Sequence, residues 1–260
     1  MNGRIKQMGQ FLMVALGIFC TLFILIQNPA AAAENGQQVE EENLSLNARA
    51  AVLMDADSGR ILYGKEADSV YPIASTTKIM TLIVALENNE ADKIVTASAY
   101  AASMPKVHLG VQAGERYRME DLYYAMMLES FNDAAVMIAE GTAGSVEAFA
   151  VMMNEKAVSL GCTQTYFITP NGLDAVDEKG VHSSTAADMA KIMRYAIQDE
   201  MFRQITQTMH YAFNDCDGKR SFSVHNKNAL LTMMGGVLSG KTGYTADAGY
   251  CYVCAVQKGD

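Results

Sequence analysis

Residues 74–81 read Ala-Ser-Thr-Thr-Lys-Ile-Met-Thr, and this stretch carries the strongest structural signal in the chain. It places Ser75 three residues before Lys78. Apolar residues then recur at helical spacing, at Ile79, Leu82, Ile83 and Leu86. That spacing predicts a buried helix, and residues three apart on a helix share one face. We therefore expect the Lys78 amine to reach the Ser75 hydroxyl.

A serine and a lysine at this spacing can form a nucleophile and its base. A serine hydroxyl attacks well only when a neighbouring base takes its proton. Lysine is such a base only as the neutral amine, which requires burial or a nearby positive charge. Ser75 in a first helical turn would also lie among unpaired N–H groups that stabilise an oxyanion. Taken alone, the pattern is weak, because a serine three residues before a lysine occurs often by chance, and the alternative is a helix start with a solvated lysine.

The N-terminus predicts export. Arg4 and Lys6 precede an uncharged apolar run at 11–26, and four alanines follow at 30–33. This order is typical of a signal peptide, so we expect residues 1–33 to be removed by cleavage after Ala33. The alternative is an uncleaved membrane anchor, because the apolar run is only slightly shorter than a span. Residues 34–47 are polar and acidic, and we expect them to form a flexible lead-in.

Composition limits the class of protein. The chain has 260 residues, of which 50% are hydrophobic, and a net charge of −9. The acidic balance argues against nucleic acid as a partner, because that affinity comes from Lys and Arg on phosphates. Beyond the signal peptide four cysteines remain, and we expect buried free thiols, since a large apolar core needs no disulfide. They are Cys162, Cys216, Cys251 and Cys254.

The order of elements predicts an α+β fold for a catalytic domain over 48–260. We expect strands at 48–54 and 60–63, then helices starting at 75, 119, 134, 146 and 184. Strands at 209–213, 221–224, 237–244 and 249–256 follow. One antiparallel sheet flanked by helices, with a helical subdomain beside it, would bury every apolar face. The early hairpin and the late strands would share that sheet.

Two further groups of polar residues accompany the serine–lysine pair. Ser130, Phe131 and Asn132 lie in an expected loop between helices, where a hydroxyl and an amide can relay a proton and hold a substrate. An ordinary loop cap is the alternative. Lys241 and Thr242 lie on an expected strand and could bind a carboxylate. A surface lysine in a glycine-rich turn is the alternative there.

The residues after Thr242 also predict a function. Gly243 lets another chain approach the strand closely. The backbone N–H of Tyr244 could be the second donor to an oxyanion.

Together, the three motifs occur in class A β-lactamases and penicillin-binding proteins. Within that group the chain closely resembles the low-molecular-mass D-alanyl-D-alanine carboxypeptidases, peptidase family S11. The resemblance runs from about Asn47 to Asp260 and includes the segments 54–59, 170–174, 182–186, 241–245 and 248–250. It implies a β-lactamase/DD-peptidase-like fold and an exported serine-type carboxypeptidase without cofactor or metal. Such an enzyme removes the terminal D-Ala from peptidoglycan stem peptides through an acyl-enzyme on Ser75, and β-lactams inhibit it.

The resemblance also implies catalytic roles. Lys78 would act as the base for Ser75, Ser130 would pass a proton to the leaving D-Ala, and Asn132 would orient the Lys78 amine and the substrate. His182 would make a structural hydrogen bond rather than act as a base.

Substrate-binding roles follow in the same way. Lys241 and Thr242 would hold the terminal carboxylate. Lys227 falls where some relatives carry a carboxylate-binding arginine, and a solvated lysine is an equal alternative.

The chain departs from the family pattern at its end. Relatives continue past the strand at 249–256 with another strand and a helix, so we expect a C-terminal truncation. A peripheral membrane contact would require that further segment.

Two other functions compete. A class A β-lactamase would need a loop Glu and Ser-Asp-Asn, whereas this chain has Phe131 in the middle position and no Glu in 170–174. A catalytically dead wall-binding fragment is the third, although the retained Ser75, Lys78 and Lys241 argue against it.

Overall fold

The computed structural model describes residues 45–259. The expected signal peptide and most of the lead-in therefore lie outside the described residues. From Ala48 onward the chain forms one unit, which is the unit described below.

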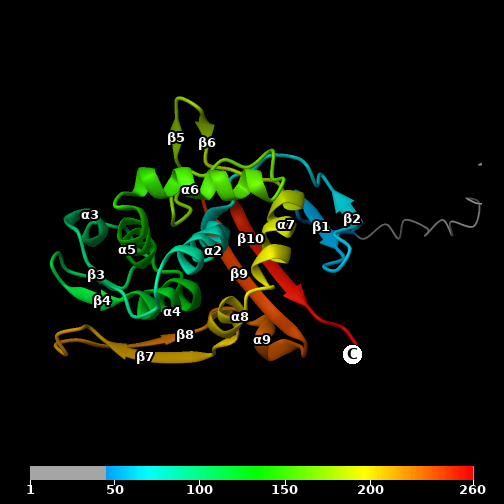
Figure 1. The fold of residues 1–260 in the computed structure, drawn as a ribbon. Coiled ribbons are helices and arrows are strands. Elements are labelled where there is room, and N and C mark those ends of the chain that lie inside the picture. Colours follow the sequence, from blue (N-terminus) through cyan, green and yellow to red (C-terminus); the bar gives the residue numbers. More distant parts are fainter. Residues whose placement is uncertain (1–44, 260) are drawn as a thin grey trace, which may run out of the picture. The chain divides into compact units, whose positions relative to one another are not determined.

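A buried helix forms the centre of this unit. The 3-10 turn η1 (Ala74–Thr77) runs directly into α2 (Lys78–Asn88), and every residue from Lys78 to Ala85 is buried. The predicted buried helix is thus confirmed. Among the described residues, five more helices pack around α2 (Figure 1): α4 (Met119–Glu129), α5 (Asn132–Ala143), α6 (Val146–Ser159), α7 (Ala186–Ala196) and α8 (Glu200–Gln207).

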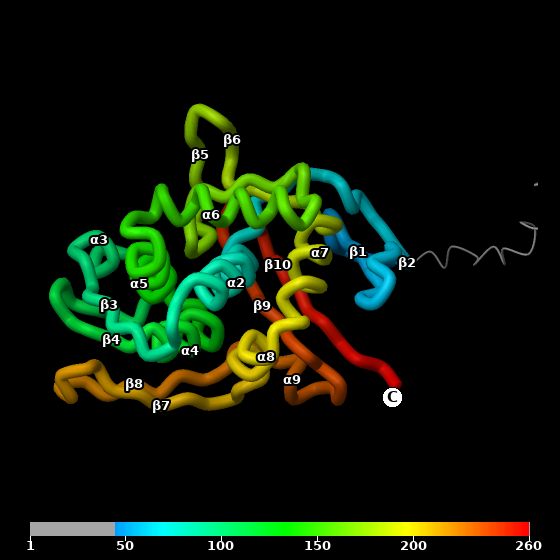
Figure 2. The backbone as a smooth tube through the Cα atoms, in the orientation of Figure 1, coloured from blue at the N-terminus to red at the C-terminus, as the bar shows by residue number. Residues whose placement is uncertain are grey.

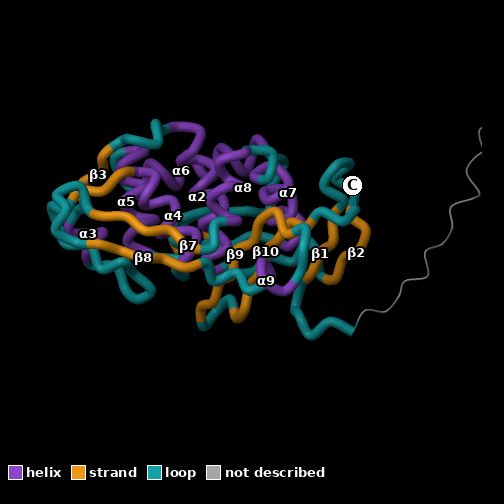
Figure 3. Tube along the Cα trace, turned by 90° about the horizontal axis from the view of Figure 1, so that it is seen from below, coloured by secondary structure: helices purple, strands orange, loops and turns teal. Residues whose placement is uncertain are grey.

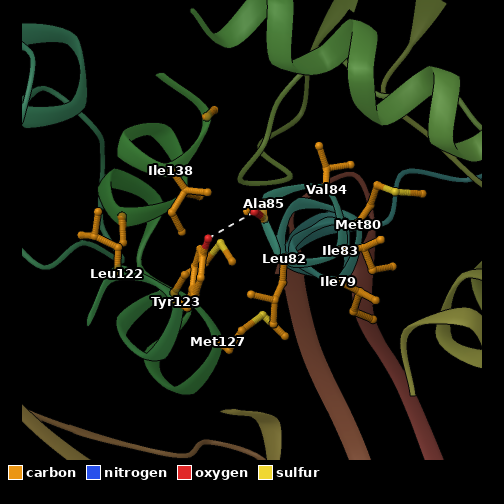
Figure 4. Packing of buried hydrophobic residues seen from close by; sticks show 14 of the residues in the cluster. Ile79, Met80, Leu82, Ile83, Val84, Ala85, Leu122, Tyr123, Met127 and Ile138 are labelled. Atoms are coloured by element: carbon orange, nitrogen blue, oxygen red, sulfur yellow. Dashed lines mark hydrogen bonds between the residues drawn. The ribbon is translucent and has the colours of Figure 1, made fainter. Parts of the chain in front are cut away.

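Helix α2 is central because its apolar side chains point to several neighbours at once. Figure 4 shows Leu82 of α2 among the core side chains, with Tyr123 and Met127 of α4 beside it. The Tyr123 hydroxyl donates a hydrogen bond to the Ala85 carbonyl over 3.3 Å. This packing fixes the position of α2, the helix that begins at Lys78.

The antiparallel strands form separate pairs. Strand β1 (Ala51–Met54) pairs with β2 (Ile61–Lys65), and β9 (Val237–Thr245) pairs with β10 (Gly249–Val256). Within residues 45–259 no hydrogen-bonded ladder joins the two pairs, and β1 and β10 each pack against α7 instead. The α+β class is confirmed, but the prediction that both pairs share one sheet is wrong for the described residues.

A long hairpin of β7 (His210–Asn214) and β8 (Ser221–His225) packs along α4, as Figures 2 and 3 show from two directions. The Tyr211 ring stacks on Tyr124 with centroids 3.9 Å apart, and the Tyr211 hydroxyl donates to the Asp121 carboxylate. The antiparallel pair of β3 (Ile94–Thr96) with β4 (Arg116–Arg118) contacts the same helical region. This part is the helical subdomain.

Several short elements were not predicted. These are α3 (Ala99–Ala102), β4, α8, α9 (Leu230–Met233) and the hairpin of β5 (Val176–Asp177) with β6 (Gly180–Val181). Helix α8 packs on α2, α4 and β9, so it helps to hold β9 beside η1.

The described residues test the expectation for the four cysteines. Cys162, Cys216, Cys251 and Cys254 are free, as predicted, but of these four only Cys162 is buried, whereas Cys216 and Cys251 are partly exposed and Cys254 is exposed. It lies on a face of β10 that the rest of the described chain leaves open. Among residues 45–259, no single helix is long and apolar enough to cross a membrane, and α5 and α6 meet that test only as a pair bent by 83°.

Candidate active site

Ser75 lies in η1, one residue after a backbone that turns the chain sharply. Ala74 has a φ of +47°, in the left-handed region. The Thr76 hydroxyl donates to the Ile73 carbonyl over 2.6 Å, and the Thr77 hydroxyl donates to the Ala74 carbonyl over 2.8 Å. These two bonds tie the turn to itself and so hold Ser75 at the start of α2.

The Lys78 amine meets three oxygen atoms. Its Nζ lies 2.9 Å from Ser75 Oγ, 3.0 Å from Asn132 Oδ1 and 2.6 Å from the Asn171 carbonyl oxygen. The oxygens of Asn132 and Asn171 can only accept. A neutral amine therefore donates its two protons to them and keeps its lone pair for the Ser75 hydroxyl. The expected reach from Lys78 to Ser75 is present.

Burial and a neighbouring cation favour that neutral amine. Burial lowers the pKa of Lys78 well below its ordinary value, and the positive charge of Lys241 lowers the pKa further. The negative charge of Asp133 acts in the opposite direction. Lys78 thus has the environment that a lysine base requires.

Lys241 and Ser130 meet although their elements are far apart in sequence. Lys241 is buried on β9, and its Nζ donates to Ser130 Oγ over 3.0 Å and to the Thr242 carbonyl over 2.8 Å. Burial lowers the pKa of Lys241 to about 7, and the charge of Lys227 acts in the same direction. Ser130 ends α4 with a left-handed φ of +68°, which turns the chain toward Asn132.

Strand β9 approaches η1 at Gly243. A Cβ atom on this residue would lie 2.8 Å from the Ser75 backbone nitrogen, so only glycine allows this approach. Thr242 and Tyr244, on either side, both have exposed side chains. The Tyr244 ring contacts the Tyr250 ring of β10, with centroids 4.8 Å apart.

Lys227 lies near these residues but is already paired. Its ammonium lies 2.8 Å from the Glu129 carboxylate and donates to the Glu129 carbonyl over 3.2 Å. Its charge still reaches Lys241, since it lowers the pKa of that amine. The structure therefore places Lys227 beside the site with its ammonium bound to Glu129.

His182 supports η1 from behind. Its Nδ1 accepts the N–H groups of Ile168 and Thr169, at 2.9 and 3.2 Å. The proton therefore lies on Nε2, which donates to the Thr77 hydroxyl over 2.8 Å. Burial lowers the pKa of His182 to about 4, and the charge of Lys78 adds to this effect. The expected structural hydrogen bond of His182 is confirmed.

Sequence reasoning missed the acceptor at Asn171, because a backbone carbonyl leaves no signature in the side chains. The only hint is Gly172, which follows it with a φ of +80°. A Cβ on Gly172 would lie 2.0 Å from the Ala74 carbonyl oxygen, so the loop also requires glycine to pack against η1. Asp133 and Glu129 were missed as well, since their partners are distant in sequence.

Comparisons with known proteins place the chain in one family. A family model described as D-alanyl-D-alanine carboxypeptidase, Peptidase S11, matches residues 36–260. The chain is 34% identical to the D-alanyl-D-alanine carboxypeptidase DacF of Bacillus subtilis over 92% of its length, and it spans 61% of that relative. It is also 34% identical to DacB2 of Mycobacterium tuberculosis, over 80% of this chain and 70% of the relative.

A solved structure shows the same similarity. The crystal structure of a D-alanyl-D-alanine carboxypeptidase from Mycobacterium tuberculosis superposes with a TM-score of 0.76 at 33% identity. The match covers 82% of this chain and 78% of that one.

Proposed function

Because this chain belongs to the peptidase S11 family, whose model is described as D-alanyl-D-alanine carboxypeptidase, we propose that it is an exported serine-type D-Ala-D-Ala carboxypeptidase. Its substrate is the peptidoglycan stem peptide, and β-lactams inhibit it by acylating Ser75. Export is supported by the sequence of residues 1–33, in which a basic start precedes an apolar run and an alanine tract.

One observation carries the proposal. The Lys78 amine lies 2.9 Å from Ser75 Oγ and is flanked by two oxygens that can only accept protons. A solvated lysine at a helix start would be charged and exposed, whereas this amine is buried and its pKa is lowered. The arrangement fits an activated serine nucleophile.

The reaction begins when Ser75 Oγ attacks the carbonyl carbon between the two terminal D-Ala residues and gives its proton to Lys78. The oxyanion that forms accepts hydrogen bonds from the backbone N–H groups of Ser75 and Tyr244. The tetrahedral intermediate then collapses, and the C–N bond breaks. Ser130 passes a proton to the leaving D-Ala amine and is reprotonated from Lys78. Water hydrolyses the ester in a second step and releases the shortened stem.

The substrate carboxylate requires a cation in the cleft. Lys241 supplies it, with the Thr242 hydroxyl beside it on β9. Ser130 Oγ lies 3.0 Å from Lys241 Nζ. The group that binds the carboxylate and the group that protonates the leaving amine are therefore neighbours. Asn132 holds the Lys78 amine and binds the substrate backbone.

A fluorescent-penicillin gel and a D-Ala release assay on a Lys-D-Ala-D-Ala peptide test the proposal. We expect a long-lived adduct and D-Ala release from the wild type, and neither from Ser75→Ala. Ser159→Ala, which removes an exposed hydroxyl at the end of α6, is the matched control and should behave as the wild type. Rapid turnover of penicillin would instead indicate a β-lactamase, and no adduct would indicate a binding module.

A further inference from the structure

Asp133 has no part in the mechanism above, yet its carboxylate is buried one residue beyond Asn132. Its Oδ1 accepts the N–H of Leu109 over 2.8 Å. Its Oδ2 accepts the N–H groups of Gly110 and Val111, at 2.7 and 3.2 Å. Three successive peptide N–H groups thus converge on one carboxylate, which fixes the end of the 105–111 segment to α5. Hydrogen bonds to a charged acceptor are the stronger kind.

The other end of the 105–111 segment holds Asn132. The Asn132 N–H donates to the Val107 carbonyl over 2.8 Å, and its Nδ2 donates to the Pro105 carbonyl over 3.3 Å. With the amide nitrogen held in this way, the amide oxygen points to Lys78 Nζ, 3.0 Å away. A flipped amide would present its NH2 group to the amine and would lose both contacts.

We propose that Asp133 is a positioning residue for the acylation step. Its carboxylate holds the 105–111 segment, the carbonyls of that segment orient the Asn132 amide, and Asn132 in turn orients the Lys78 amine toward Ser75. This inference rests on the proposed function, because it concerns the rate at which Ser75 is acylated. Misplacing a reacting group by about 1 Å can cost roughly a hundredfold in rate.

Asp133 also acts on Lys78 by its charge. Among the described residues, the charged and titratable groups that interact electrostatically with the Lys78 amine are Lys241 from β9, Asp133 from α5 and His182 from the loop before α7. Burial and Lys241 lower the pKa of Lys78, whereas Asp133 raises it. Removing the negative charge of Asp133 therefore lowers the pKa of Lys78 further and keeps its amine neutral at lower pH. A residue that only stabilised the fold would leave this pH dependence unchanged.

A double-mutant cycle tests the positioning role. Asp133→Asn, Asn132→Ala and the double variant are compared by the second-order rate constant of acylation by fluorescent penicillin, normalised to the fraction of molecules that form an adduct. We expect Asp133→Asn alone to slow acylation about tenfold or more, and to add little when Asn132 is already Ala. If the double variant slows acylation by the product of the two single-variant factors, the two residues act independently and the proposal is overturned.

The second readout is the acid limb of the pH profile of the same rate constant, where the rate falls as the pH is lowered. We expect Asp133→Asn to move it to lower pH by about half a unit or more. Asp188→Asn is the matched control, because Asp188 is also buried and accepts the Gln164 N–H over 3.0 Å. It should lower the melting temperature without changing the normalised rate or its acid limb. An unmoved acid limb in Asp133→Asn would contradict the charge effect.

If Asp133→Asn does not fold, Asp133→Glu replaces it. This variant keeps the charge but displaces the carboxylate, so we expect slower acylation with the acid limb of the wild type. Acylation at the wild-type rate would overturn the positioning role. The wild type in these assays separates the two proposals: no adduct at all contradicts the proposed function, whereas a normal adduct without coupling between Asp133 and Asn132 contradicts only this inference.

Discussion

Gly243 of β9 lies directly against the backbone amide of Ser75, so that a Cβ atom on Gly243 would be 2.8 Å from the Ser75 nitrogen and 3.1 Å from the Thr76 nitrogen. Both nitrogens belong to the turn that carries the nucleophile. The glycine therefore brings the strand with Lys241 and the turn with Ser75 close enough to form one site.

Gly243→Ala should separate these two elements. Because backbone atoms rather than a flexible side chain would meet the new methyl group, we expect acylation by penicillin to fall by about a hundredfold. Gly235→Ala, at a glycine with open space around its Cβ position, is the control and should acylate normally. A Gly243→Ala protein that acylates at the wild-type rate would show that the close approach is not needed.

Lys241 should bind a substrate carboxylate less well as the pH rises. Its pKa of about 7 means that the amine is a cation below that pH and loses its charge above it. We expect the KM for the D-Ala-D-Ala peptide to rise as the pH passes through 7. In Lys241→Arg the charge persists at high pH, so the KM should stay flat. A peptide with a C-terminal amide, which lacks the carboxylate, should not show the rise in either protein.

Lys227→Gln distinguishes two roles for that lysine. The charge of Lys227 lowers the pKa of Lys241, so its removal should raise that pKa and shift the increase in KM to higher pH. At low pH the KM should be unchanged, because the Lys227 ammonium is bound to Glu129. A higher KM at every pH would instead support direct binding of the substrate by Lys227. Lys219→Gln, an exposed lysine that binds Asp217, is the control.

His182 should make the fold sensitive to acid. Its pKa is about 4 in the folded protein and 6.5 in the unfolded chain, so between these values only the unfolded chain takes up the proton. The contribution of His182 to the free energy of unfolding is therefore fully present above pH 6.5. It falls as the pH drops toward 4, by an amount on the order of 3 kcal/mol. Urea unfolding across this range should show a flatter pH dependence for His182→Gln than for the wild type. Equal slopes would argue against this contribution.

Local spacing made part of the site predictable. Ser75 and Lys78 lie on one helical face because three residues separate them, and the apolar residues after Lys78 indicated that this face is buried. The glycine at 243 was also predictable, since a strand without a side chain at one position allows close approach.

The remainder depends on contacts that spacing does not encode. The Asn171 carbonyl, the segment bound by Asp133 and the ion pair between Glu129 and Lys227 each join residues far apart in sequence. The relation between the strand pairs was predicted wrongly for a similar reason. Short continuous apolar runs predict that β1 and β10 are strands, but they do not determine whether the edges of these strands pair or whether both strands pack on α7.

One acceptor for the Lys78 amine is a peptide oxygen, and every amino acid supplies that atom. No missense mutation in the codon for Asn171 can delete this oxygen. The acceptor for the Lys78 amine is therefore kept whichever side chain residue 171 carries. The codon for Gly172 is the sensitive one, because every missense mutation in it adds a Cβ. That atom would lie where the Ala74 carbonyl already is, so it would displace the Asn171 acceptor together with its loop.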